Sequence, residues 1–71
     1  MNAPDYYGHL RDITETYLCT GHIADALRVL YTYRDLADYE LRVAVGALSR
    51  ERIRSEKEWV TQRIREVKKV L

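Results

Sequence analysis

The side chains best suited to acid–base or metal chemistry are few and widely separated in this sequence. His9 and His22 are the only histidines, and neither has further ligands at the spacing that metal sites use. Cys19 is the single cysteine, so an internal disulfide and a cysteine-pair metal site are excluded. The sequence contains no glycine-rich phosphate loop and no nucleophile motif. We therefore expect a protein that is not an enzyme and that needs no metal or cofactor.

Tyrosine dominates the aromatic residues, with six Tyr, one Trp and no Phe. It combines apolar area with a polar hydroxyl and is enriched at protein interfaces. Two tyrosines and three charged residues fall on the polar side of the expected middle helix and form a candidate partner-binding patch: Arg28, Tyr31, Asp35, Tyr39 and Arg42. The alternative is a set of unconnected, solvated side chains.

The single tryptophan, Trp59, is expected about 110° around its helix from the apolar stripe, close to Arg63. A lone Trp away from the core face is typical of a binding hot spot, so both residues join the candidate partner-binding set. The alternative is that the first helix, or a second copy of the chain, covers Trp59.

Basic residues collect on the rest of the last helix, interrupted by Glu51 and Glu58. A basic helix can contact phosphates, and its affinity would then fall with salt. The interleaved acids also fit a solvated face with ion pairs along the helix, and an acidic protein partner is a third reading. The residues in question are Arg50, Arg54, Lys57, Arg65, Lys68 and Lys69.

Helices must position these side chains, because one Pro and three Gly among 71 residues disfavour both extended disorder and an all-β chain. This length supports one domain with a small core. We predict a single all-α domain over residues 1–71, a three-helix bundle with a long central helix and a long basic C-terminal helix.

The first helix is predicted over about residues 5–19. Pro4 and Asp5 suit its first turn, and Gly21 permits the left-handed conformation that ends many helices. Its apolar stripe, at spacings of four, three and four, is Tyr6, Leu10, Ile13 and Tyr17.

The second helix is predicted over about residues 22–47, with two apolar stripes that merge into an arc of about 200°. The stripes are Ile23, Leu27, Leu30, Ala37, Leu41, Ala44 and Leu48, and Ala26, Val29, Tyr33, Leu36, Val43 and Ala47. Such an arc needs cover on two sides, so the other helices are expected on its two flanks. A break near Asp35 and Asp38 is the alternative, since Asp favours helix caps.

A turn is predicted around residues 46–49, because the stripe changes phase between Leu48 and Ile53 and Ser49 can cap a new helix. The third helix then spans about residues 50–71. Its stripe, at spacings of four and three, is Ile53, Lys57, Val60, Ile64, Val67 and Leu71. This pattern predicts packing on the second helix, and a dimer seam is the alternative.

Charge divides the chain into an acidic part and a basic part. Residues 1–48 carry a net charge of −3 and residues 49–71 carry +4. No apolar run approaches the roughly 20 residues of a membrane span, and the N-terminus has no signal-peptide pattern. We therefore expect a cytoplasmic protein without a membrane partner.

Two segments carry a family resemblance. Asp5-Tyr6 with Leu10-Arg11, and residues 36–43 with Ala47, resemble the first and third helices of the Hha/YmoA family of small helical bacterial regulators. The resemblance implies a modulator that binds a nucleoid-structuring protein of the H-NS type. The sequence departs from the family pattern at residues 49–51, and residues 14–22 would require an insertion.

The leading functional hypothesis is a small non-catalytic module that binds a larger protein stoichiometrically, as an inhibitor or adaptor. Inhibitors from phages or mobile elements, including anti-CRISPR proteins, are examples of this class. A homodimer fits the small core, since short chains often need association for stability. The alternative function is a nucleic-acid-associated regulator, acting through the basic last helix or through a partner as Hha does.

Overall fold

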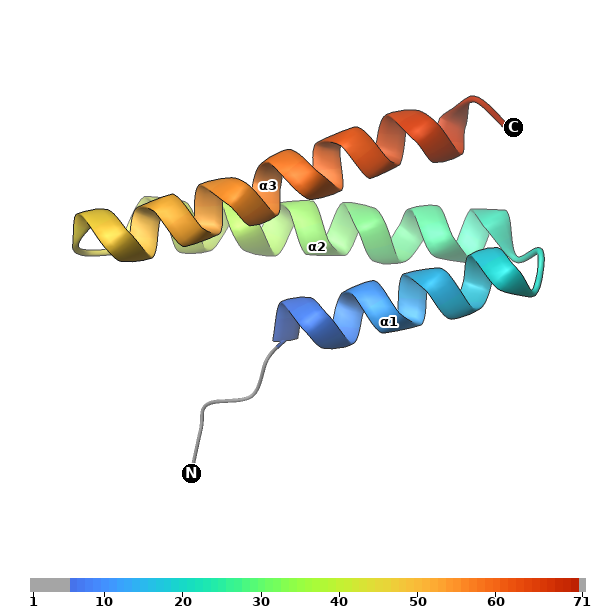
Figure 1. The fold of residues 1–71 in the computed structure, drawn as a ribbon, viewed down its shortest axis with the longest axis horizontal. Coiled ribbons are helices and arrows are strands. Elements are labelled where there is room, and N and C mark those ends of the chain that lie inside the picture. The colour runs from blue at the N-terminus through green and yellow to red at the C-terminus, as the bar shows by residue number, and fades with distance from the viewer. Residues whose placement is uncertain (1–5, 71) are drawn as a thin grey trace.

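Three α-helices follow one another along the chain in the computed structural model, which describes residues 6–70 (Figure 1). They are α1, Tyr6–Cys19; α2, Ile23–Val43; and α3, Ala47–Lys68. The helices pack against each other, and the described residues contain no strand. The predicted all-α, three-helix fold is confirmed.

The middle helix is the central element of the bundle, as its wide apolar arc predicts. α2 packs against α1 on one flank and against α3 on the other (Figure 1). Ala26, Leu30, Tyr33 and Ala37 are fully buried between these neighbours. Burying one large apolar side chain stabilises the fold by about 1.5–3 kcal/mol, so α2 supplies much of the stability. The helix runs unbroken past Asp35, and the alternative of two shorter helices is wrong.

The face that α3 turns to the core is also as predicted. Val60, Ile64 and Val67 are buried and form one cluster with the buried residues of α2. Lys57, the polar member of the same stripe, places its ammonium 2.6 Å from the Asp38 carboxylate of α2. The stripe therefore joins α3 to α2 within one chain.

The predicted core face of α1 is right at Leu10, which packs against the core, but the face as a whole is rotated by part of a turn. Tyr6 is 60% exposed, whereas Thr14 is completely buried. The Thr14 hydroxyl donates to the Leu10 carbonyl at 2.8 Å, so a polar side chain enters the core without losing a hydrogen bond. Tyr7 and Leu18 complete this face of α1. The expected helix start at Pro4 and Asp5 lies outside the described residues, as does Leu71.

The turn after α1 is the one that the sequence predicts. α1 ends at Cys19, and Gly21 has a positive φ of 80°. The His22 amide donates to the Tyr17 carbonyl at 2.8 Å, which satisfies a carbonyl of the last helical turn.

The turn between α2 and α3 comes earlier than predicted. α2 ends at Val43 rather than at Ala47, and the backbone of Ala44 is extended. Gly46 adopts a positive φ of 97°, which other residues rarely do, and α3 starts directly after it. Ser49 therefore lies within the first turn of α3 and is not its cap. None of the helices within residues 6–70 is long and apolar enough to cross a membrane.

Candidate functional site

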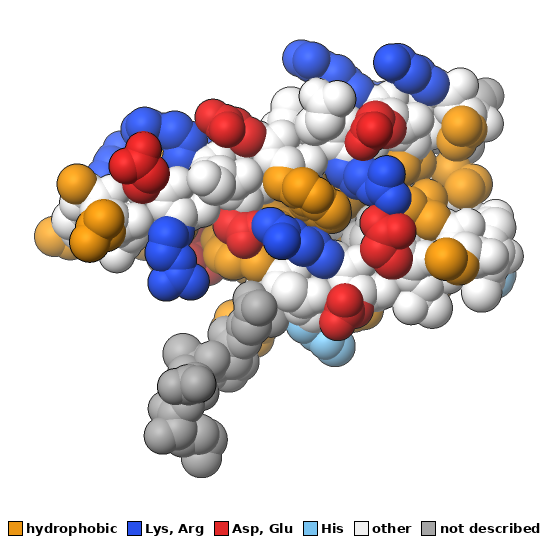
Figure 2. Space-filling model, in the orientation of Figure 1, with side chains coloured by type: hydrophobic (Ala, Val, Ile, Leu, Met, Phe, Trp, Pro, Cys, Tyr) orange, Lys and Arg blue, Asp and Glu red, His pale blue; other side chains and the backbone are white. Residues whose placement is uncertain are grey.

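A polar cluster lies where α1 and α3 approach each other across α2. The Tyr33 hydroxyl donates to Glu56 Oε1 at 2.6 Å and accepts from Arg11 Nε at 3.0 Å. Arg11 also forms an ion pair with Glu56. Figure 2 shows acidic and basic side chains next to each other over this seam, around hydrophobic side chains. One residue from each helix thus enters the same hydrogen-bonded group, which fixes how the helices pack.

Trp59 belongs to this cluster and is not a free hot spot. Its ring stacks on Tyr33 with centroids 5.6 Å apart, and the Arg11 guanidinium lies 4.7 Å from its centroid. The residue is half-buried against the core. Because Arg11 belongs to α1, the structure agrees with the alternative prediction that the first helix covers Trp59.

Arg63 has the same structural role one turn further along α3. Its Nη2 atom donates to Glu15 of α1 at 2.7 Å, and its Nη1 atom lies 3.6 Å from Glu66. The Nε atom is buried and has no hydrogen-bond partner. Arg63 is therefore a contact between α1 and α3, separate from the predicted patch on α2.

Burial also changes the acidity of two tyrosines around the cluster. Burial and the hydrogen bond to Glu56 raise the pKa of Tyr33 well above its usual value. Burial, together with the nearby Glu40 carboxylate, raises the pKa of Tyr7 to about 12. Both hydroxyls stay protonated at neutral pH, so Tyr33 remains a hydrogen-bond donor to the carboxylate.

The patch predicted on α2 is largely accessible. Arg28, Asp35, Tyr39 and Arg42 are exposed, on the side of α2 away from its buried residues. We call these four residues the α2 outer patch. Tyr31 is half-buried at its edge and packs against the core, with Arg34 and Lys68 at 5.0 and 5.5 Å from its ring centroid.

The six residues of the predicted basic face divide into those with a partner among the described residues and those without an ion pair. Arg50 donates to the Leu41 carbonyl at 3.0 Å, Lys57 pairs with Asp38, and Lys68 lies over Tyr31. The remaining residues are exposed and have no ion pair within the described part of the chain: Arg54, Arg65 and Lys69.

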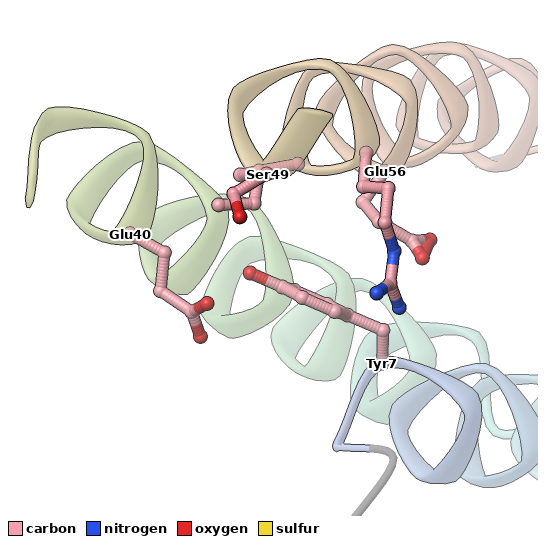
Figure 3. A pocket seen from close by; sticks show the side chains of 6 residues that line it. Tyr7, Glu40, Ser49 and Glu56 are labelled. Carbon is pink, nitrogen blue, oxygen red and sulfur yellow. The ribbon is translucent and has the colours of Figure 1, made fainter. Parts of the chain in front are cut away.

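A groove that the sequence did not predict opens at the end of the molecule where α2 and α3 meet. It encloses about 240 Å³ and is lined by Tyr7, Glu40, Ser49, Arg52, Ile53 and Glu56. Figure 3 shows the Tyr7 hydroxyl pointing between Glu40 and Ser49. This hydroxyl is buried and makes no hydrogen bond of normal geometry. We call this feature the hairpin groove.

Exposed apolar side chains continue from the groove to the tip of the α2–α3 hairpin. Val43, Val45 and Leu48 are 56%, 89% and 83% exposed. Figure 2 shows hydrophobic side chains at this end of the molecule. The sequence pattern did not predict this surface, because it assigned Val43 and Leu48 to the apolar stripes of the second helix.

Within residues 6–70, no three His, Cys, Asp or Glu side chains are grouped so that they could hold a metal ion. Comparison with known proteins finds no matching family model, no matching curated protein and no matching solved structure. The resemblance to the Hha/YmoA family stays a prediction. The surfaces described above are therefore the basis for a functional proposal.

Proposed function

We propose that this protein is a non-catalytic binding module that docks on a larger protein and inhibits or adapts it stoichiometrically. The observation that carries the proposal is the α2 outer patch, an aromatic residue and three charged residues on the side of the central helix that neither α1 nor α3 covers. The opposite side of α2 is packed in the core, so its backbone is already ordered, which favours binding without a large ordering cost.

The composition of the patch suits an acidic protein surface. Tyr39 is 57% exposed, and Tyr and Arg are the residue types most often found at interface hot spots. Arg28 and Arg42 have no ion pair with any described residue, so their guanidinium groups are available for carboxylates of a partner. Asp35 between them restricts which arrangements of charge fit.

Quantitative capture from the native host tests the proposal. The immobilised wild-type chain should retain a specific protein at fixed stoichiometry, and Tyr39→Ser and Arg42→Ser should each retain much less of that same protein. Because both side chains are exposed, the melting temperature should stay close to that of the wild type. Tyr31 is unsuitable for this test, since its ring packs against the core.

A matched control separates the patch from a general loss of positive charge. Arg54→Ser removes one exposed Arg from α3 and should leave capture unchanged. Equal capture by wild type, Tyr39→Ser and Arg42→Ser would remove the patch from the proposal.

A nucleic-acid-associated regulator is the alternative function. It is supported by the exposed Arg54 and Arg65 of α3, by the exposed Lys69 directly after this helix, and by the resemblance to Hha. The exposed Glu51 and Glu58 on the same helix weaken its attraction for phosphates. Binding to DNA and RNA titrated with salt discriminates the two: a steep loss of affinity with salt favours the alternative, and no binding at low salt favours a protein partner.

A further inference from the structure

The α2–α3 hairpin is longer than the helix that covers it. α1 has 14 residues, whereas α2 has 21 and α3 has 22. At 1.5 Å per residue, roughly 10 Å of the hairpin therefore extends beyond the first turn of α1 (Figure 1). The hairpin groove lies at this step, with Tyr7 from the first turn of α1 at its floor (Figure 3).

Two charged groups in the groove lack an ion-pair partner. The Tyr7 hydroxyl is buried and makes no hydrogen bond of normal geometry, but it lies close enough to the Glu40 carboxylate for its pKa to be raised. Glu40 on the α2 wall and Arg52 on the α3 wall form no ion pair with any described residue. The groove thus carries one unpaired charge of each sign, on opposite walls.

On each wall of the groove, a charged residue is followed by an exposed aliphatic residue in the direction of the hairpin tip. Val43 follows Glu40 by three residues, and Leu48 precedes Arg52 by four, so each exposed aliphatic residue lies one helical turn beyond the charged one. The α2 wall thus carries a negative charge and an aliphatic side chain, and the α3 wall carries a positive charge and an aliphatic side chain at matching positions. Such a surface is complementary to a second copy of itself.

We propose that the hairpin groove is the interface of a symmetric dimer of this chain, with the two-fold axis along the groove. A two-fold axis in this direction places the α2 wall of one copy against the α3 wall of the other, as isologous contacts require. Glu40 then faces Arg52 of the second copy, and in the same register Val43 faces Leu48. Two ion pairs and two aliphatic contacts form at once.

This inference goes beyond the proposed function and uses a different side of α2. Arg28, Asp35 and Arg42 lie more than about 100° around the helix from Glu40, so the dimer leaves these charged residues uncovered. Each dimer would then present two outer patches to its partners. Arg42→Ser should dimerise like the wild type, so failure of either idea can be recognised without the other.

A charge swap tests the interface directly, by sedimentation of the purified full chain over a range of concentrations. The wild type should form dimers, and Glu40→Arg and Arg52→Glu should each raise the dissociation constant at least tenfold, because each places like charges opposite each other. The double variant Glu40→Arg/Arg52→Glu restores both pairs with their signs exchanged and should return the constant to within a few-fold of wild type. Glu58→Arg makes the same change of charge on the exposed side of α3 and should have no effect.

Circular dichroism of each variant checks that the monomers fold, and Leu48→Ser should weaken the dimer as a second, uncharged probe of the contact. A chain that stays monomeric at all concentrations would overturn the proposal, as would a double variant that fails to recover. Removing residues 1–5 should leave dimerisation unchanged. A dimer that forms only after their removal would mean that this chain's own N-terminal segment occupies the groove.

Discussion

The half of the α2–α3 hairpin that α1 covers differs sharply from the half that extends beyond it. In the covered half, Tyr33, Glu56 and Arg11 satisfy one another by hydrogen bonds and an ion pair. In the uncovered half, Glu40 and Arg52 have no ion-pair partner within residues 6–70. α2 and α3 supply Tyr33 and Glu56 as well as Glu40 and Arg52, whereas Arg11 comes from α1.

The difference shows that the extent of α1 decides which residues of the α2–α3 hairpin become structural. Trp59 lies within reach of Arg11 of α1 and is packed into the seam, whereas Leu48, on the same helix, has no α1 beside it and is 83% exposed. Because helix periodicity does not encode where a neighbouring helix stops, residues of similar type acquire opposite roles. We therefore expect the covered half to account for most of the stability, and the uncovered half is the part that the proposed dimer would use.

The largest effect is expected from removing the aromatic ring at the centre of the covered half. Tyr33 is fully buried, so Tyr33→Ala should destabilise the protein by about 3–5 kcal/mol, the usual cost of truncating a buried aromatic side chain. The matched change Tyr39→Ala, on the exposed side of the same helix, should alter stability by less than about 0.5 kcal/mol. Urea unfolding followed by circular dichroism measures both. Similar losses for the two variants would remove the distinction between the halves.

A smaller loss is expected when only the hydroxyl is removed. Tyr33→Phe leaves Glu56 without one donor and Arg11 without one acceptor, so it should cost about 1–3 kcal/mol. Tyr39→Phe is the control, and its exposed hydroxyl should contribute nothing measurable. Adding Glu56→Gln to Tyr33→Phe should cost less than the sum of the two single changes, because both act on one network.

Much of the fold could be predicted from the sequence because the apolar stripes of the second and third helices and a glycine at each turn specify it. The α3 stripe and the central position of α2 follow directly from periodicity. Thr14 was missed because its burial depends on a hydrogen bond to its own helix, which hydropathy does not reveal. The end of α2 was missed because apolar residues continue past Val43 into the connection, where only the positive φ of Gly46 marks the turn.

The candidate surfaces were predicted less completely. Four residues of the α2 patch are exposed as expected, since exposure follows from the helix phase. Trp59 and Arg63 instead contact α1, and their partners Arg11 and Glu15 lie more than 40 residues away in the sequence. The hairpin groove depends on the relative lengths of all three helices, so no local pattern indicates it.

High pH should test the covered half through its tyrosines. Folding raises the pKa of Tyr33 and raises that of Tyr7 to about 12, above the usual value of about 10. The resulting stabilisation is complete below about pH 10 and is lost as the pH rises through the folded-state values. Tyrosinate absorbance should therefore show Tyr33 and Tyr7 ionising well above pH 10, together with unfolding. Glu40→Gln should lower the pKa of Tyr7 alone, since it removes one of the charges that oppose ionisation.

The smallest effect is expected from the exposed ion pair between Asp38 of α2 and Lys57 of α3. The hydrogen bond from Lys57 lowers the pKa of Asp38 below its usual value of about 3.9. The ion pair therefore stabilises the folded protein at pH values above the usual pKa of Asp. This stabilisation is lost as the pH falls through the lower pKa that Asp38 has in the folded state. Both side chains are about 40% exposed, so Asp38→Asn should cost at most about 0.5 kcal/mol near neutral pH, and the difference from wild type should vanish in acid. A loss as large as that of Tyr33→Phe would show that the bundle depends on this surface pair as much as on the buried cluster.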